Sequence, residues 1–287
     1  MQPGFTLRAA RSALHDPRES FERLQGRIDA HKDRQRIDAN GGPRQLYPTV
    51  DDPLRALHDA IGAPWPCAVS ASFAGVWDEL IAELDSLRVR VGLASYRGWN
   101  DGDRAMSGAA WCAVQHLRPA TVVETGVAHG VTSRVVLDAM QRVGLGQLVS
   151  IDLPAVDPAL HREIGIAVPD RLKGRWTYVA GTSRERLPEL LRRNGEPGVF
   201  IHDSLHTGRN TRFELTTIWP VLRPGGVVIV DDVHRSIGFH DFVARARPEA
   251  SFAADHLLGS GMWGAAVKPG THNDGREATS PANRVHA

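Results

Sequence analysis

The sequence VVETGVAHGVTS, residues 122–133, carries the strongest indication of the fold. A short apolar run ends at Glu124, and a helix-like segment, SRVVLDAM, follows a few residues later. Between them lie three small residues, Gly126, Ala128 and Gly130. Small residues permit a sharp turn that brings a ligand close to main-chain amides and to the positive end of the next helix. We therefore expect a strand, a turn and a helix with an anion-binding site, although a tight connection without a ligand has the same pattern.

Short apolar runs alternate with helix-like stretches on both sides of this turn. The runs are rich in Val and Ile and lie at residues 121–124, 148–152, 177–180, 199–203 and 227–231. Such runs are typical of parallel strands that helices cover on both faces. The alternation predicts an α/β fold with a doubly wound parallel sheet.

The first hundred residues are predicted to be mainly helical. In DPRESFERLQGRIDAHKDRQR, residues 16–36, the apolar side chains of Phe21, Leu24 and Ile28 recur at helical spacing. This stripe predicts an amphipathic helix that docks onto the domain or onto a second subunit, with attachment to a membrane surface as the alternative.

Composition and charge exclude several classes of protein. The chain has 287 residues, of which 34 are Lys or Arg and 33 are Asp or Glu. Because these charges nearly cancel, the chain as a whole has no positive electrostatic field that would attract nucleic acid. No apolar run approaches the roughly 20 residues that cross a bilayer, and the start lacks an apolar signal core. The two cysteines, Cys67 and Cys112, lack the spacing of a metal motif and cannot form a disulfide framework. We expect a cytoplasmic protein without a membrane span and without a nucleic-acid partner.

A second acidic residue follows the glycine turn at the distance of a ribose-binding site. The run LVSID ends at Asp152, about 20 residues beyond the turn, where a carboxylate can accept hydrogen bonds from both hydroxyls of a ribose. A nicotinamide dinucleotide would satisfy this pattern, but its fingerprint has glycine where this chain has Glu124. That carboxylate would repel pyrophosphate and attract an amino group, which disfavours a nicotinamide oxidoreductase.

Four segments in this order resemble the class I methyltransferases. They are ETGVAHG at 124–130, SIDLP at 150–154, FIHDSLH at 200–206 and LRPGGVVIVDDV at 222–233. The likeness covers roughly residues 99–267 and implies a seven-stranded, mostly parallel, Rossmann-like sheet that binds S-adenosylmethionine. Within the class, the chain is similar to bacterial sugar O-methyltransferases of the macrocin and mycinamicin type, with cephalosporin hydroxylase-like proteins as near relatives.

The resemblance also implies how the chain is divided. We expect residues 99–268 to form the S-adenosylmethionine-binding methyltransferase domain and residues 1–98 a helical N-terminal extension. Residues 269–287 have few large apolar side chains and are expected to form a disordered tail.

The resemblance assigns the cofactor-binding residues. Glu124, Gly126 and Gly130, in the turn that also holds Ala128, would surround the methionine part of S-adenosylmethionine, and Asp152 would hold its ribose.

The adenine end departs from the family pattern. The family usually ends its third strand with an acidic residue near the adenine amino group, whereas this chain has AGTSRERL, with Thr182 at that position. Thr182 and Ser183 either contact adenine or cap the following helix.

Three carboxylates are expected at the chemical end of the site. Asp203 follows the fourth strand, and Asp231 and Asp232 follow the fifth. The carboxyl ends of parallel strands share one edge, and clustered carboxylates suit Mg²⁺. In the sugar O-methyltransferases that the chain resembles, the matching positions bind Mg²⁺ together with two neighbouring hydroxyls of the substrate. In the alternative without a metal, Asp203 holds the amino group of the cofactor and the aspartate pair caps a helix.

Histidines near these carboxylates are candidates for proton transfer. His206 lies three residues after Asp203 and is expected to act as the general base, with support from the resemblance. His202 should point to the opposite side of its strand, and His234 could approach the metal or the substrate.

The predicted reaction is in-line methyl transfer from S-adenosylmethionine to a hydroxyl of a small molecule, a sugar or a natural-product glycoside, with Mg²⁺ assistance. The alternatives are a metal-independent methyltransferase and a hydroxylase-like protein that transfers no methyl group. Tyr96, Trp99 and Asn100 would form a lid or pack beneath the N-terminal helices. The acceptor is not identified by the sequence, and a homo-oligomer through the N-terminal helices is possible.

Overall fold

The computed structural model describes residues 17–87, 102–154, 158–257 and 261–270. The predicted lid residues Tyr96, Trp99 and Asn100 lie outside the described residues, as do nearly all of the predicted tail and the expected boundary near residue 99.

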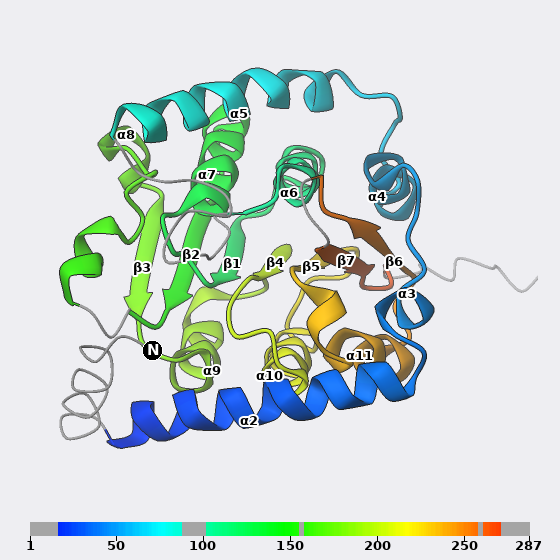
Figure 1. Cartoon of the computed structure of the whole chain (residues 1–287). Helices are drawn as coiled ribbons and strands as arrows, with labels where there is room; N and C mark the ends of the chain where they lie inside the picture. Colours follow the sequence, from blue (N-terminus) through cyan, green and yellow to red (C-terminus); the bar gives the residue numbers. More distant parts are fainter. Residues whose placement is uncertain (1–16, 88–101, 155–157, 258–260, 271–287) are drawn as a thin grey trace, which may run out of the picture.

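A seven-stranded sheet forms the centre of the molecule (Figure 1). Its strands are β1 (Thr121–Thr125), β2 (Gln147–Asp152), β3 (Trp176–Ala180), β4 (Val199–His202), β5 (Val227–Val230), β6 (Ala250–Asp255) and β7 (Met262–Val267). The order across the sheet is β3-β2-β1-β4-β5-β7-β6, and only β7 runs antiparallel to its neighbours. The predicted seven-stranded, mostly parallel, doubly wound sheet is confirmed.

Helices cover both faces of this sheet. Those of the C-terminal part are α6 (Arg104–Leu117), α7 (Val131–Val143), η2 (Pro158–Glu163), α8 (Asp170–Lys173), α9 (Ser183–Asn194), α10 (Gly208–Ile218), η3 (Val233–Arg235) and α11 (Gly238–Ala246). Successive strand residues alternate between two cores, because strand side chains point to opposite faces. Val122 joins the core beneath α6 and α7, whereas Val123 joins the core beneath α9, α10 and α11. Both faces are therefore buried, as the Val-rich runs predict.

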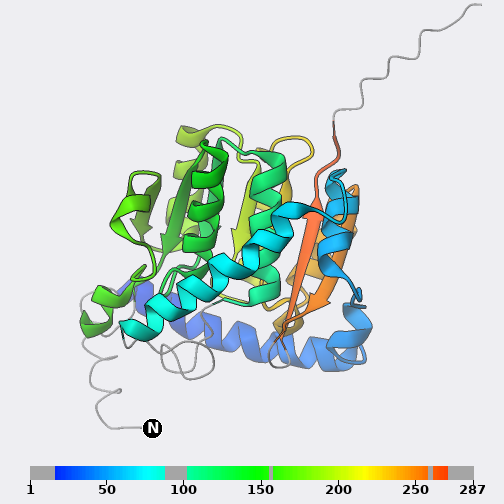
Figure 2. The ribbon, with the colours of Figure 1, turned by 90° about the horizontal axis from the view of Figure 1, so that it is seen from above.

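The N-terminal helices extend these two layers. They are α2 (Pro17–Ala39), α3 (Pro43–Leu46), α4 (Pro53–Ile61) and α5 (Ala68–Ser86). Figure 1 shows α2 along one edge of the molecule, against α10, and α5 along the opposite edge. Seen from above, α5 crosses α6 and α7 obliquely (Figure 2). Within the described ranges, no helix is long and apolar enough to span a membrane.

The amphipathic helix is present as α2, but a different face of it docks. Leu24 and Ile28 from the predicted apolar stripe are 57% and 47% exposed, and the side chain of Phe21 lies outside the described part. The buried positions are instead Gly26, Asp33 and Ile37. The stripe therefore does not dock onto the domain, and its docking onto a second subunit stays a prediction. The face that does dock carries Asp33, which pairs with a backbone N–H of the domain. Asp33 Oδ2 accepts a hydrogen bond of 2.7 Å from Gly208 N at the start of α10.

Candidate functional site

The turn after β1 is held against the end of β4. Gly126 has φ +88°, and a Cβ atom there would overlap the carbonyl oxygen of Asp203. Only glycine allows both this conformation and this close approach. Gly130, at φ +83°, is the N-cap of α7, and Ala128 also has a positive φ of 47°. The predicted turn therefore leads directly into the N-terminus of a 13-residue helix.

Glu124 is buried behind this turn with one oxygen unpaired. Its Oε2 accepts hydrogen bonds from Ser133 Oγ and Ser150 Oγ, each of 2.6 Å. Its Oε1 has no hydrogen-bond partner among the described residues. Burial raises the pKa of Glu124 to about 7. Because buried polar atoms are nearly always paired, the Oε1 atom indicates a place for an external donor such as an amino group.

Asp152 lies at the end of β2 and faces the same turn. Its Oδ2 accepts a hydrogen bond of 3.0 Å from the Ala128 N–H. Its charge also contributes to the raised pKa of Glu124, so the two carboxylates are electrostatic neighbours. The acidic residues at the ends of β1 and β2 thus converge, as the Rossmann-like pattern predicts.

Thr182 and Ser183 lie at the start of α9. Thr182 is the N-cap residue, and its Oγ1 accepts a hydrogen bond of 3.3 Å from Glu185 N. Ser183 Oγ donates to Asn210 Oδ1 at 3.4 Å. The capping role of Thr182 is therefore present in the structure, whereas a contact with adenine stays a prediction.

Asp203 and Asp231 come together at the ends of β4 and β5. Burial raises the pKa of Asp203 well above its usual value, and the charge of Asp231 and a hydrogen bond with it add to this effect. Burial alone would also raise the pKa of Asp231, but His256 donates to its Oδ1 at 2.7 Å and lowers that pKa instead. Asp231 is therefore the more readily ionised partner of the pair, and Asp203 the more readily protonated one.

Asp232 follows Asp231 in the same loop, and its side chain is 15% exposed. It has φ +51° and is the N-cap of η3, but its side chain makes no capping hydrogen bond. Its Oδ2 pairs with Arg235 Nε at 2.7 Å, and its Oδ1 lies 3.6 Å from His234 Nδ1. His234 also accepts from the backbone of Met262 at 3.2 Å. The aspartate pair is therefore engaged with basic side chains and does not cap a helix through the side chain of Asp232.

Two overlapping groups of side chains at this edge offer metal ligands. Asp203, His206 and Asp231 form one group, in which all ligand atoms lie within 4.8 Å of one another. Asp231, Asp232 and His256 form the second. Carboxylate oxygens beside one imidazole fit a divalent cation such as Mg²⁺ or Mn²⁺. The predicted carboxylates fit a metal, and the structure adds imidazole nitrogens to each group.

His206 lies between the carboxylates. Its Nε2 is 3.8 Å from Asp203 Oδ1 and 3.7 Å from Asp232 Oδ2, and its Nδ1 has no hydrogen-bond partner among the described residues. Burial lowers the pKa of His206, and Asp232 and Asp231 offset this only in part. A neutral imidazole whose ring nitrogen has a free lone pair can accept a proton.

A buried network behind the site is absent from the sequence-based prediction. His202 points away from Asp203, and its Nδ1 lies 2.6 Å from Glu214 Oε2. Glu214 also accepts from Thr125 Oγ1 at 2.5 Å and from Ser204 Oγ at 2.8 Å. Burial alone would raise the pKa of Glu214, but His202 and the hydrogen bonds lower it to about 2. This charged group links the turn after β1 to the loop after β4.

Sequence reasoning also missed His256. It follows β6, which runs parallel to β5 because both strands pair antiparallel with β7. The carboxyl end of β6 therefore lies at the same edge as Asp231. The polar residues after this strand are the local sequence signal of a possible site residue. They can be placed beside Asp231 only when the strand order is known.

Comparisons with known proteins agree with this arrangement. Residues 123–233 match the family model described as a methyltransferase domain. The match begins within β1 and ends at η3, so it includes the predicted residues of both ends of the site, and the expectation of a methyltransferase is confirmed at this level. No curated protein matches the chain.

Solved structures with a similar fold include three methyltransferases. An O-methyltransferase from Bacillus cereus in complex with S-adenosylhomocysteine is 16% identical, with a TM-score of 0.48 over 68% of this chain and 91% of that one. The O-methyltransferase TomG from Streptomyces achromogenes, in complex with S-adenosylmethionine, is 17% identical, with a TM-score of 0.43 over 70% and 90%. A methyltransferase of Podospora anserina bound to S-adenosylhomocysteine is 12% identical, with a TM-score of 0.46 over 71% and 97%.

Proposed function

We propose that the protein is an S-adenosylmethionine-dependent O-methyltransferase that acts on a hydroxyl of a small molecule, a sugar or a natural-product glycoside, with Mg²⁺ assistance. One observation carries the proposal: the unpartnered Oε1 of Glu124 lies behind a turn with positive φ angles, with Asp152 beside it. This arrangement suits a ligand that carries both an amino group and a ribose. The matched methyltransferase domain supports the same assignment.

Each end of the cofactor has candidate partners in this chain. Glu124 Oε1 would accept from the amino group, and the amides near Gly126 and Gly130 would contact the carboxylate at the N-terminus of α7. Asp152 would hold the ribose hydroxyls. Ser183, beside the cap residue Thr182, is the candidate contact to adenine.

The reacting end would use the carboxylates and His206. S-adenosylmethionine supplies an electrophilic methyl carbon, and Mg²⁺ held by Asp203, Asp231 and Asp232 would lower the pKa of a nearby hydroxyl. Neutral His206 would accept the hydroxyl proton. The residues that follow β4 and β5 would align the acceptor oxygen behind the methyl group, which is most of what this reaction requires.

A metal-independent methyltransferase is the second candidate, and a specific observation favours it. Arg235 pairs with Asp232, and His256 pairs with Asp231, each at 2.7 Å. These basic groups offset part of the charge that a metal would otherwise neutralise. His206 would remain the base in such an enzyme.

Cofactor binding is the first test. In isothermal titration, the wild-type chain should bind S-adenosylhomocysteine, and Asp152→Ala should weaken binding by about 10- to 100-fold, because charged hydrogen bonds contribute roughly 1.5–3 kcal/mol. Asp170→Ala is the matched control, since Asp170 is an aspartate whose side chain is 95% exposed. Equal affinities in all three proteins would contradict the assignment of Asp152.

Methyl transfer separates the remaining candidates. Labelled S-adenosylmethionine should transfer its methyl group to a member of a panel of glycosides and phenols in Mg²⁺, and His206→Ala should lower kcat by about 10²- to 10⁴-fold. Loss of activity in EDTA with unchanged S-adenosylhomocysteine binding supports the metal, and full activity in EDTA supports the second candidate. Cofactor binding without transfer to any acceptor would favour a hydroxylase-like protein that transfers no methyl group.

The exposed apolar residues of α2 offer a contact surface for a second copy of the chain. A homo-oligomer formed through this helix would cover Leu24 and Ile28, and light scattering of the purified chain tests this. A cytoplasmic location is still expected from the cysteine content and is tested by cell fractionation.

A further inference from the structure

Both cysteines of the chain lie far from the predicted carboxylate site in sequence, and Cys112 is buried whereas Cys67 is partly buried. Cys67 is the N-cap of α5, and Cys112 lies inside α6. Burial raises the pKa of Cys112 to about 12, and the nearby Cys67 adds to this effect. The fold therefore brings together two thiols whose sequence spacing suggests no relation.

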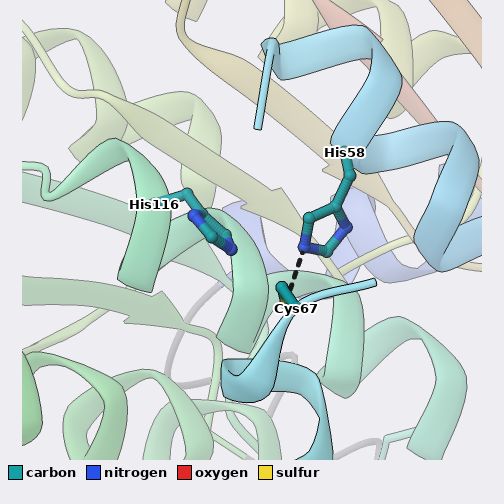
Figure 3. Close-up of side chains that lie close together, drawn as sticks. All are labelled: His58, Cys67 and His116. Atoms are coloured by element: carbon teal, nitrogen blue, oxygen red, sulfur yellow. Dashed lines mark hydrogen bonds between the residues drawn. The ribbon is translucent and has the colours of Figure 1, made fainter. Parts of the chain in front are cut away.

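His58, on α4, presents a lone pair to this cluster. Its ring is completely buried, and its Nδ1 lies 2.6 Å from the Leu54 carbonyl oxygen. A carbonyl can only accept, so Nδ1 carries the proton and Nε2 has the free lone pair. Nε2 faces Cys67 Sγ at 3.0 Å (Figure 3). A histidine whose outer nitrogen donates to a carbonyl is the usual arrangement of a metal ligand.

His116 completes the cluster from α6, one helical turn after Cys112. Its ring lies 4.9 Å from that of His58, and its buried Nε2 has no hydrogen-bond partner among the described residues. Burial lowers the pKa of His116. Figure 3 shows the side chains of His58, Cys67 and His116 gathered from three separate elements.

We propose that His58, Cys67 and His116 bind a Zn²⁺ ion. The ligand atoms of His58, Cys67 and His116 lie within 4.8 Å of one another. Ligands at 2.0–2.3 Å from one tetrahedral Zn²⁺ are separated by about 3.3–3.8 Å, so small side-chain rotations suffice. Thiolate and imidazole are both common ligands of Zn²⁺ in proteins.

Hydrogen bonding or a disulfide alone would leave part of the cluster unpaired. A thiol–imidazole hydrogen bond uses only Cys67 and His58, and the buried His116 Nε2 stays without a partner. A disulfide between the cysteines would likewise leave both imidazole lone pairs without a donor. Because the three side chains supply sulfur and nitrogen, they favour Zn²⁺ over the Mg²⁺ expected at the carboxylates.

The ion would join the N-terminal extension to the methyltransferase domain. His58 and Cys67 come from α4 and the start of α5, whereas His116 comes from α6, which packs beside β4 and β5. Three protein ligands leave the fourth position of a tetrahedral Zn²⁺ for a water molecule. Because the ion would join three separate elements, its binding should stabilise the fold.

Cobalt titration of the reduced, metal-free, full-length protein tests the proposal. Thiolate ligation of Co²⁺ produces a near-ultraviolet charge-transfer band, which oxygen and nitrogen ligands do not give. The chain has only two cysteines, so such a band must arise from this cluster. We expect the band to saturate at one Co²⁺ per chain and to disappear on addition of Zn²⁺, with a rise in Tm in Zn²⁺. A wild-type protein that gives no band, or that oxidises to a Cys67–Cys112 disulfide and binds no metal when reduced, would overturn the proposal.

Variants identify the ligands. Cys67→Ser and His116→Gln should each weaken Zn²⁺ binding by more than about 100-fold, since even outer partners of metal ligands affect affinity 10- to 100-fold. Asp203→Asn removes a carboxylate at the other site and should keep the cobalt band unchanged. A band that survives in Cys67→Ser, or that is lost in folded Asp203→Asn, would contradict the assigned ligands.

Discussion

At the scale of single residues, Glu124 shows how binding capacity costs stability. Its carboxylate is completely buried, and only Oε2 is hydrogen-bonded among the described residues. A buried charge with an unsatisfied oxygen is unfavourable, and for this reason burial raises the pKa of Glu124 from 4.5 to about 7. Between these two values the folded protein keeps the proton and the unfolded chain releases it. The contribution of Glu124 to stability is therefore present below pH 4.5 and is lost as the pH rises to 7.

Glu124→Gln should separate this cost from its function. The amide is neutral at every pH, so the variant avoids the cost of a buried charge at high pH. The change in free energy of unfolding caused by the substitution should therefore be more favourable at pH 8 than at pH 5, by up to about 3 kcal/mol. Its affinity for S-adenosylhomocysteine should fall, because the amide cannot neutralise an amino group. Urea unfolding and calorimetric titration measure the two effects. Glu79→Gln, at an exposed glutamate, is the control and should show neither. A pH-independent change in stability would contradict the assigned origin of the raised pKa.

At the scale of elements, α2 docks through a carboxylate and not through an apolar stripe. Asp33 is 3% exposed and accepts from Gly208 N at the first turn of α10, where backbone N–H groups have no partner within the helix. The carboxylate also lies at the positive end of α10. Burial nevertheless raises the pKa of Asp33, which means that desolvation outweighs these favourable contacts with its ionised form. The docking of α2 therefore combines one paired polar group with the buried side chain of Ile37.

Asp33→Ala should destabilise the protein by about 1–3 kcal/mol, because the buried Gly208 N–H would lose its acceptor. Asp38→Ala, at an exposed position of the same helix, changes helix propensity in the same way and should cost less than about 0.5 kcal/mol. Asp33→Asn keeps an acceptor oxygen and should recover part of the loss. Urea unfolding at pH 7 checks all three, and equal losses in the two alanine variants would exclude the capping role.

At the scale of the whole molecule, Gly126 joins the two halves of the sheet. The strand order reverses between β1 and β4, and ligands in open α/β sheets bind outside the carboxyl ends at such a point. Here the turn after β1 lies directly against the carbonyl of Asp203. One close backbone contact therefore couples the cofactor side to the carboxylate side.

Gly126→Ala should disturb both sides together. The new methyl group makes the positive φ unfavourable and overlaps with Asp203, and together these effects should lower the free energy of unfolding by about 2–4 kcal/mol. The substitution should also weaken S-adenosylhomocysteine binding. Gly144→Ala is the matched control, because Gly144 has φ +74° and no atom near the site of a Cβ. The control should cost only about 1 kcal/mol and leave binding unchanged. Similar losses of stability in both variants would show that the overlap has no effect.

Much of the architecture was predictable from local pattern. Strand, turn and helix periodicities are short-range properties, and the carboxyl ends of parallel strands must share one edge. The predicted meeting of Glu124 with Asp152, and of Asp203 with Asp231, followed from these two facts alone. Local sequence patterns are therefore enough to predict the α/β class and the position of the candidate site.

Three features became apparent only from the folded chain: the docking face of α2, the contact of His256 with Asp231, and the cluster around Cys67. Each joins segments that are distant in sequence, and the periodicity of one segment does not predict which other segment it contacts. Their geometry depends on how α2, α4 and α5 wrap the domain and on the reversal of β7. Local sequence patterns encode which face of an element is apolar, whereas the identity of a facing side chain is set by the packing of the whole chain.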